Sequence, residues 1–285
     1  MKRLKDYIQE SILDMDSTDK PIRECIKQFL EDHYEGGHKC IISKNPDTDG
    51  KYIVNSKGHL VFLTRTAESL TNGMFKFGEV DGYFVCSRTP IKSLEGAPKK
   101  VKRDFRCVDC RSLKSLENAP EFVGADFDGS SCILLTNLEG APKNIDGSFN
   151  CQYCTSLISL KGMPEKITGP IYLDKCTSLV SLKGLPENSR GSIYCNDCIS
   201  LTNLEGAPKK VNGDFSCIGC TSLKSLKGAP LDVSFSFNCR NCTSLDSLEY
   251  APKKVGISFF CNDCGAEFSE VKIRKNTKIG FEVDC

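Results

Sequence analysis

The chain has 285 residues, a formal net charge of +1 at pH 7 and 39% hydrophobic residues, so it is long enough for one or two domains. A nearly neutral chain has no bulk electrostatic attraction to nucleic acid or to an anionic membrane surface. No apolar run approaches about 18 residues and the N-terminus lacks the apolar core of a secretory signal, so we expect neither a membrane-spanning helix nor a signal peptide.

The first 14 residues, MKRLKDYIQESILD, combine charged positions with an apolar face. Four apolar residues would share one side of a helix, as in an ordinary amphipathic start: Leu4, Ile8, Ile12 and Leu13. The order M-K-x-x-x-[DE]-[YF]-I-x-E also resembles the capsid-targeting leader of internal head proteins of tailed phages. That resemblance implies docking in the prohead and cleavage after Glu10 in Ile8-Gln9-Glu10, before Ser11. Both interpretations of residues 1–14 stay open.

Residues 15–85 are expected to form a small α+β N-terminal cap. Pro21 suits the first turn of a helix that ends near Glu35, because Gly36-Gly37 follows. Short apolar runs separated by turn residues predict three strands: Cys40–Ser43, Tyr52–Asn55 and Leu60–Leu63. A degenerate first turn then ends at Phe84 and Cys86. We expect this cap to cover the open apolar end of the region that follows.

Residues 86–264 repeat one 22-residue phrase, roughly F-x-C-x-x-C-x-S-L-x-S-L-x-G-A-P-x-x-V-x-G-x. Eight prolines mark the period: Pro98, Pro120, Pro142, Pro164, Pro186, Pro208, Pro230 and Pro252. A leucine-based period of about 20 to 29 residues predicts a leucine-rich-repeat solenoid, whose stacked turns bury one continuous core. Alternation at Phe105 and Cys107 predicts one strand per turn, and Pro and Gly disfavour helix on the return path. The predicted fold is mostly β, with a parallel concave sheet and an extended convex side.

The order P-x-x-V…F-x-C-x-x-C-x-x-L-x-x-L is similar to the short repeats of secreted bacterial leucine-rich effectors. It is more similar still to leucine-rich-repeat proteins of large tailed phages. The phrase LEGAPKKV-GDF-C of those phage proteins stands at Leu204–Cys217, and its first part at Leu94–Val101. The resemblance covers about residues 75–264 and implies the fold, but it names no ligand because this scaffold carries many binding functions.

Eighteen cysteines are present, and eight of them recur at the second Cys of the phrase. These ladder cysteines are Cys110, Cys132, Cys154, Cys176, Cys198, Cys220, Cys242 and Cys264. CxxC pairs separated by 18 residues fall within zinc-ribbon spacing, so a metal-binding CxxC protein is one alternative function. The first Cys is replaced in two turns, by Gly129 and Leu173, and no histidine lies in the repeats, so we expect no metal and no cofactor.

The ladder cysteines are expected to be reduced packing residues. Equivalent Cβ atoms on adjacent strands lie about 4.8 Å apart, which is too wide for a disulfide. A thiol behaves as a small hydrophobe, and its weak S–H donor would contact a backbone carbonyl of the next turn. So many free thiols indicate a reducing compartment.

Outward-pointing strand residues would form the concave binding face of the solenoid. Candidates for contact with a protein partner are Arg106, Asp128, Asn150, Tyr172, Asp174, Tyr194, Asn196, Asn238, Arg240 and Phe260. Tyr172 and Tyr194 stand one turn apart among small polar groups, a composition that suits protein recognition. The alternative is a solvated sheet face whose tyrosines stack only for cross-strand stability.

The remaining surfaces carry weaker signals. Lysine pairs such as Lys99-Lys100 and Lys209-Lys210 recur on the convex side, and we interpret them as a solvated face in preference to a nucleic-acid site. No P-loop, nucleophile elbow or metal-ligand helix appears, so no catalytic residue is assigned. Residues 265–285 are expected to form a C-terminal cap with six apolar residues: Phe268, Val271, Ile273, Ile279, Phe281 and Val283.

The sequence predicts a non-enzymatic, protein-binding leucine-rich-repeat protein of a tailed phage, packaged in the capsid and delivered to the host. An alternative is a virion structural or cargo protein that docks on other virion proteins. Both roles imply a virion or host protein as the partner, without nucleic acid or membrane, and place the chain in the capsid interior or the host cytoplasm.

Overall fold

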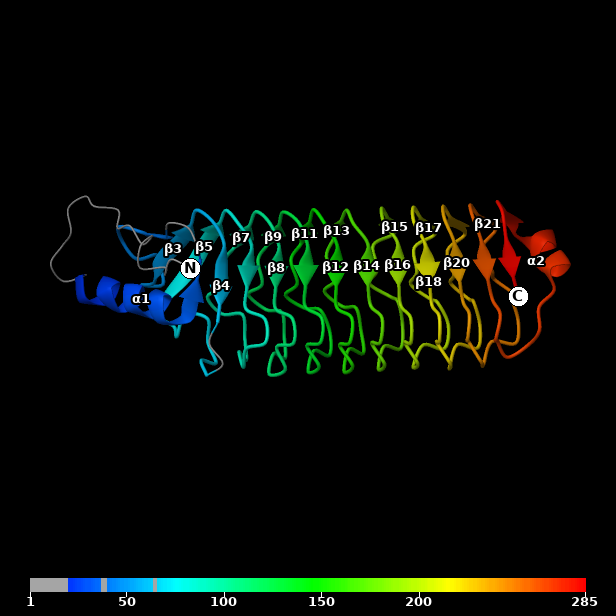
Figure 1. The fold of residues 1–285 in the computed structure, drawn as a ribbon, viewed down its shortest axis with the longest axis horizontal. Helices are drawn as coiled ribbons and strands as arrows, with labels where there is room; N and C mark the ends of the chain where they lie inside the picture. Colours follow the sequence, from blue (N-terminus) through cyan, green and yellow to red (C-terminus); the bar gives the residue numbers. More distant parts are fainter. Residues whose placement is uncertain (1–19, 37–39, 64–65) are drawn as a thin grey trace.

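The computed structural model describes residues 20–36, 40–63 and 66–285. The predicted processing residues Ile8, Glu10 and Ser11 lie outside the described residues. The described chain winds into an elongated β-solenoid, with α1 (Lys20–His33) at one end and α2 (Glu270–Asn276) at the other (Figure 1). The mostly β solenoid predicted from the repeat is confirmed.

One 12-stranded sheet, called here the front sheet, runs along the solenoid (Figure 1). Its strands, in spatial order, are β1 (Tyr34–Glu35), β4 (Leu60–Phe62), β6 (Phe84–Val85), β8 (Phe105–Arg106), β10 (Phe127–Asp128), β12 (Phe149–Asn150), β14 (Ile171–Tyr172), β16 (Ile193–Tyr194), β18 (Phe215–Ser216), β20 (Phe237–Asn238), β22 (Phe259–Phe260) and β24 (Val283–Asp284). Residues 22 positions apart pair directly along the repeats, as Phe127 does with Phe105 and Phe149. The predicted strand of each repeat is therefore present.

The return path of each turn carries a second short strand, whose pairing into sheets the sequence did not predict. A seven-stranded sheet contains β13 (Lys166–Ile167), β11 (Asn144–Ile145), β9 (Phe122–Val123), β7 (Lys100–Val101), β5 (Phe75–Val80), β3 (Tyr52–Ser56) and β2 (Cys40–Ile42). A five-stranded sheet contains β15 (Asn188–Ser189), β17 (Lys210–Val211), β19 (Asp232–Val233), β21 (Lys254–Val255) and β23 (Lys278–Ile279). The back of the solenoid is extended, as predicted, and it is also hydrogen-bonded from turn to turn.

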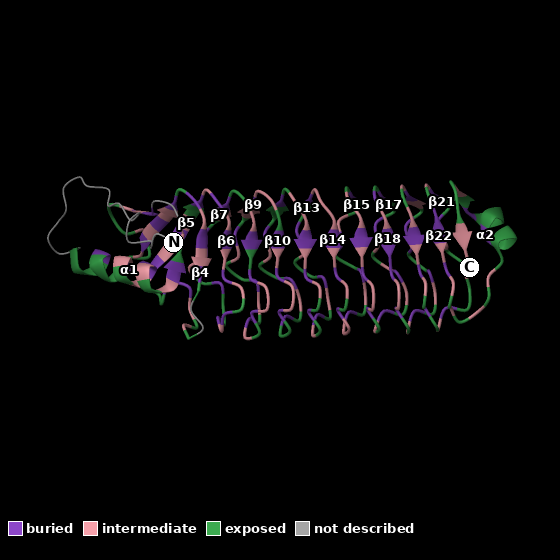
Figure 2. Ribbon diagram, viewed as in Figure 1, coloured by how far each residue is buried: buried purple, intermediate pink, exposed green. Residues whose placement is uncertain are grey.

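The core consists of columns of identical residue types that stack along the solenoid. The phenylalanines that begin the front strands are buried, and the rings of Phe84, Phe105, Phe127 and Phe149 stack with centroid separations of 5.3 to 5.8 Å and interplanar angles of 5 to 8°. The leucines and ladder cysteines of each turn fill the rest of the interior. Each front strand of the repeats buries its first residue, and Figure 2 shows these buried segments along the solenoid. The stacked turns thus share one continuous core, as the repeat requires.

A left-handed corner precedes each proline. Gly140 has φ of 86°, and a Cβ on it would lie 2.3 Å from the backbone nitrogen of Glu117 in the preceding turn. Asn118 and Tyr250 occupy the same corner in two other turns, with φ of 68° and 67°. Glycine is therefore favoured because it adopts this conformation without strain and allows neighbouring turns to approach.

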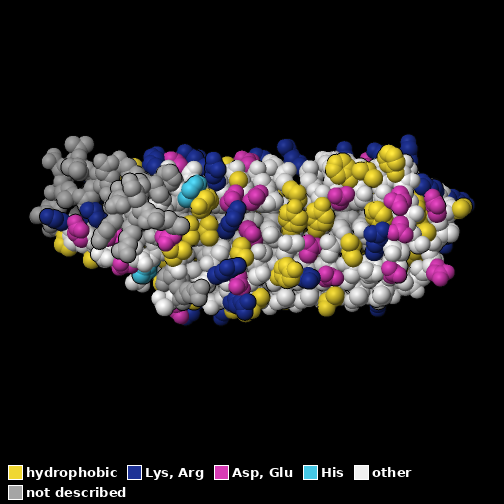
Figure 3. All heavy atoms as spheres, in the orientation of Figure 1, with side chains coloured by type: hydrophobic (Ala, Val, Ile, Leu, Met, Phe, Trp, Pro, Cys, Tyr) yellow, Lys and Arg dark blue, Asp and Glu magenta, His cyan; other side chains and the backbone are white. Residues whose placement is uncertain are grey.

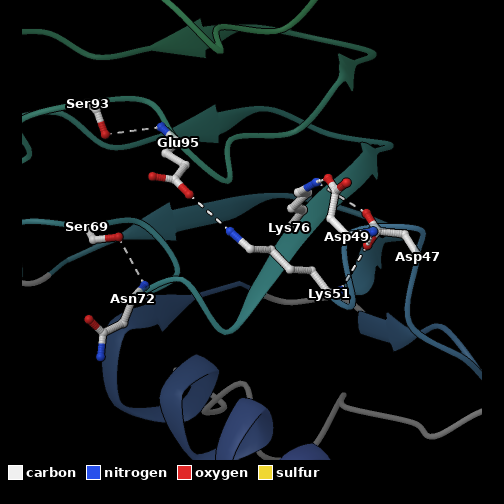
Figure 4. A network of polar contacts seen from close by, with 8 residues as sticks. All are labelled: Asp47, Asp49, Lys51, Ser69, Asn72, Lys76, Ser93 and Glu95. Carbon is white, nitrogen blue, oxygen red and sulfur yellow. Dashed lines mark hydrogen bonds and ion pairs between the residues drawn. The ribbon is translucent and has the colours of Figure 1, made fainter.

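The N-terminal cap agrees with the predicted elements. Strands β2, β3 and β4 lie where the sequence placed them, and α1 packs on the cap through the buried Ile26 and Leu30. Ion pairs tie the loop before β3 to the first turns, with Lys51 on Glu95 at 3.0 Å and Lys76 on Asp47 at 3.3 Å (Figure 4). These partly exposed pairs position the loop and add little stability.

The C-terminal cap differs from the prediction at two residues. Helix α2 was not predicted, and it buries Ile273 while Val271 stays 82% exposed. Phe281 is 77% exposed, so it and Val271 do not contribute to a buried cap. The sequence showed six apolar residues but no regular period over so short a helix, and it could not tell which of them face inward.

The left-handed corner generates a prediction about stability. Gly140→Ala should lower the free energy of unfolding by about 2 kcal/mol or more, because alanine is strained at positive φ and its Cβ meets backbone. Urea unfolding followed by circular dichroism measures the effect. The matched control is Asn118→Gly at the same corner, which should be neutral or slightly stabilising. A wild-type midpoint for Gly140→Ala would contradict this account of the corner.

Candidate functional site

The outer face of the front sheet collects all ten residues predicted to contact a partner. The second residue of each strand forms one outward column, in which Asn150, Tyr172 and Tyr194 are directly paired neighbours. Residues two positions further along each turn form a second column, which includes Asp174, Asn196 and Arg240, since alternate residues of an extended chain share a face. On the face shown in Figure 3, small groups of hydrophobic side chains lie at several places along the molecule, among polar and charged ones.

Tyr172 and Tyr194, called here the tyrosine pair, are the central feature of this face. Their rings stack with centroids 5.3 Å apart and planes 8° apart, and both residues are half-buried. The Tyr194 hydroxyl donates to Asp214 Oδ2 at 3.3 Å. Burial raises the pKa of the Tyr194 phenol, to which the Asp214 carboxylate adds, so Tyr194 stays a neutral hydrogen-bond donor.

Asp214 is a residue of the site that the sequence prediction missed. It precedes the Phe of β18, in the same column as Asp104 and Asp126, and Ser236 N donates to its Oδ1 at 3.0 Å. That column of small acidic and hydroxyl residues was the available signal. Whether Asp214 contacts the tyrosine pair depends on the side-chain orientation of Tyr194, which the sequence does not specify.

Several of the predicted contact residues also hold the backbone of the face. Asp174 Oδ1 accepts a hydrogen bond from Asn196 N at 2.8 Å, and Asn196 Oδ1 accepts from Ile218 N at 2.9 Å. Asp128 and Asn150 cap the turns that follow their strands, through Ser130 N and Gln152 N. These side chains are therefore fixed in place, and the face presents a preorganised surface.

The C-terminal part of the face holds an arginine between an aromatic ring and polar groups. The Arg240 guanidinium carbon lies 4.1 Å from the Phe260 ring centroid, and its Nε donates to Asn262 Oδ1 at 2.6 Å. It also forms an ion pair with Asp284. At the other end, Arg106 pairs with Asp104 at 2.6 Å. Both arginines of the face are thus already neutralised within the chain.

The ladder cysteines form a second regularity, inside the solenoid. Each Sγ lies 3.0 to 3.3 Å from a backbone carbonyl oxygen of the preceding turn. The predicted S–H contact is present, but its direction was wrong, because the acceptor lies in the preceding turn and not in the next one. The acceptor always belongs to the first Cys position of the phrase, where Gly129 and Leu173 serve Cys154 and Cys198. The first Cys can therefore vary, because its backbone carbonyl is what the contact uses.

The environment of three of these thiols keeps them protonated. Burial raises the pKa of Cys176, Cys198 and Cys220, so each remains an S–H donor at neutral pH. The ladder cysteines are free thiols and all are buried except Cys264, which is half-buried. Within residues 20–36, 40–63 and 66–285, no group of three or more His, Cys, Asp or Glu side chains is arranged to hold a metal ion.

Neither of the two helices in the described part of the chain is long and apolar enough to cross a membrane. Comparison with protein-family models, with curated proteins and with solved structures found no match in any of the three.

The cysteine ladder generates a second prediction. Cys198→Ala should lower the free energy of unfolding by about 1–3 kcal/mol, because it removes the donor to Leu173 O and leaves a small cavity. Cys25→Ala is the matched control, since Cys25 is exposed and its loss should change stability by less than about 0.5 kcal/mol. Equal unfolding midpoints for the two variants would show that the ladder contact contributes nothing.

Proposed function

We propose that this chain is a non-enzymatic protein-binding solenoid, which recognises a protein partner through the outer face of the front sheet. The observation that carries the proposal is the tyrosine pair: two aromatic rings held outward in the turns where the interior lacks an aromatic residue. In those turns Ile171 and Ile193 replace the buried phenylalanine of the other repeats.

In these two turns the aromatic residue lies on the outer face and an isoleucine lies inside. This placement argues against a purely stabilising role for the tyrosine pair. Phenylalanines stacked inside, such as Phe105 on Phe127, keep a similar ring separation and are fully buried. Rings on the outside stack equally well but are less buried. Each Å² of apolar area left exposed forgoes about 25 cal/mol of stabilisation. Outward tyrosines offer a partner rigid contact area at low entropic cost.

The chemistry of the face also favours binding over catalysis. Its carboxylates and amides are engaged with backbone amides of neighbouring turns, as Asp174 is with Asn196 N. The repeats contain no histidine that could act as a general base near neutral pH. Near the solenoid's N-terminal end, the His59 ring stacks on Tyr83 at 3.8 Å. A fixed polar surface around a central aromatic anchor is typical of a protein interface.

Delivery by a tailed phage is the cellular role that we propose for this binding protein, in which it is packaged in the capsid and released into the host. The support is the sequence of residues 1–14 together with the resemblance of the repeats. Mass spectrometry of purified virions tests it, because packaging with cleavage would place Ser11 at the N-terminus. Absence of the protein from virions would contradict this role and leave the binding function unaffected.

The tyrosine pair predicts a selective loss of binding. A Tyr172→Ala/Tyr194→Ala double variant should bind its partner with at least about 2 kcal/mol less free energy, because central aromatic anchors carry most of the energy of an interface. Its melting temperature should fall by only a few degrees, since a stacked pair adds about 0.5–1.5 kcal/mol. Quantitative mass spectrometry of proteins captured from infected-cell lysate measures the loss.

The matched control for this capture is Tyr250→Asn. It removes a tyrosine that is 55% exposed at a left-handed corner where Asn118 is tolerated in another turn. It should capture the same proteins as wild type. If the double variant also captured them in wild-type amounts, the proposed binding face would be wrong.

A further inference from the structure

The surface around the tyrosine pair carries negative charge that no cation of the described residues neutralises. Asp174 accepts hydrogen bonds from Asn196 N and the Gln152 amide, and Asp214 accepts from Ser236 N and the Tyr194 hydroxyl. All of these donors are neutral, and within the described residues neither carboxylate forms an ion pair. Lys175 is adjacent to Asp174 in the chain, but its ammonium lies over the Tyr153 ring at 5.1 Å. The face is therefore acidic at its centre.

Elsewhere on the same face, the chain holds one of its own arginine side chains, that of Arg240, against an aromatic ring and a carboxylate. Arg240 lies over the ring of Phe260, which is 20 residues further along, and donates to Asn262, which is 22 residues further along. Asp284 supplies the carboxylate. An aromatic ring, an oxygen acceptor and a carboxylate therefore hold a guanidinium on this surface.

Gln152 occupies the position equivalent to Arg240 four turns earlier. Tyr172 lies 20 residues after Gln152, and Asp174 lies 22 residues after it, which reproduces the spacing around Arg240. The Gln152 amide donates to Asp174, as Arg240 does to Asn262. Glutamine is neutral and shorter than arginine, so the Asp174 charge remains, and no cation of the part of the chain that the structure describes lies over the Tyr172 ring.

We propose that this position receives an arginine side chain of the protein partner, whose guanidinium stacks on Tyr172 and pairs with Asp174. The inference rests on the proposed protein-binding function and specifies the chemistry of the partner. Arginine fits better than lysine because its planar guanidinium stacks on aromatic rings and pairs with carboxylates through two hydrogen bonds.

The test uses capped peptides of the sequence Gly-Ser-Gly-Ser-Arg-Gly-Ser-Gly-Ser, titrated into the full chain with ¹³C-labelled tyrosine rings. Replacement of Tyr172 and Tyr194 by Phe, one at a time, assigns their NMR signals. The arginine peptide should shift the Tyr172 signal in a saturable manner, and the lysine version should bind more weakly. A citrulline version has nearly the same shape but no charge, and it should give no saturable shift.

Two variants test whether the arginine peptide binds at Asp174 and Gln152. Asp174→Asn should weaken binding of the arginine peptide by about tenfold or more, because a hydrogen bond to a charged group is lost. Gln152→Arg should supply the guanidinium within the chain, raise the melting temperature and abolish the peptide shift. Asp146→Asn is the matched control, since Asp146 pairs with Lys166 on the back of the solenoid and the peptide should bind this variant as it binds wild type.

Equal shifts from the citrulline peptide, wild-type affinity in Asp174→Asn, or no shift from the arginine peptide would each overturn the inference. The proposed function is judged separately, by capture of the partner. If Gln152→Arg and Asp174→Asn still capture a partner that the tyrosine double variant loses, the face binds protein without using arginine. If the double variant captures the partner as wild type does, the binding face itself is wrong.

Discussion

Backbone hydrogen bonds between successive turns are the constraint on which the rest of this structure depends. In the front sheet, amides of one turn donate to carbonyls of the next, as Phe127 does to Ser148 and Gly129 does to Asn150. Between Phe105 and Phe259 this ladder joins residues 22 positions apart and so gives the repeats equivalent corners, as the pairing of Phe127 with Phe149 and of Phe237 with Phe259 shows. It explains the glycine corner and the positive φ of the residue before each ladder cysteine, Asp109 and Lys175 among them. The thiol-to-carbonyl contacts add one further link per turn inside the core.

Because the ladder fixes the inward positions, the turns differ mainly at their outward positions. The outward column changes from Arg106 through Asn150 and Tyr172 to Phe260 while the backbone repeats. A surface of this kind is a series of geometrically equivalent positions that differ in side chain alone. Arg240 and Gln152 can therefore be compared directly, since any difference in what they hold comes from the side chains around them.

The sequence predicted the elements that follow from periodicity, and it failed where the result depends on packing in three dimensions. The front strands, the buried phenylalanines and α1 were predicted because each rests on a local repeat or a helix signal. The pairing of the return strands and the role of Asp214 depend on distances between turns, which one repeat does not contain. The direction of the Cys198 contact was wrong for the same reason. The exposure of Val271 depends on how α2 docks on the last turns.

One interface between turns combines the irregular features of the solenoid. On the return path, the seven-stranded sheet ends at β13 and the five-stranded sheet begins at β15. In β15, Ser189 stands in the position of the usual valine, and its hydroxyl donates to Gly191 O at 2.7 Å. The tyrosine pair stacks across this same interface on the front, between β14 and β16. The stacked rings therefore supply a contact on the front of an interface whose return strands are unpaired. Phenylalanines inside the solenoid would supply the same stacking, and the outward placement of these rings is why we propose that a partner contacts them.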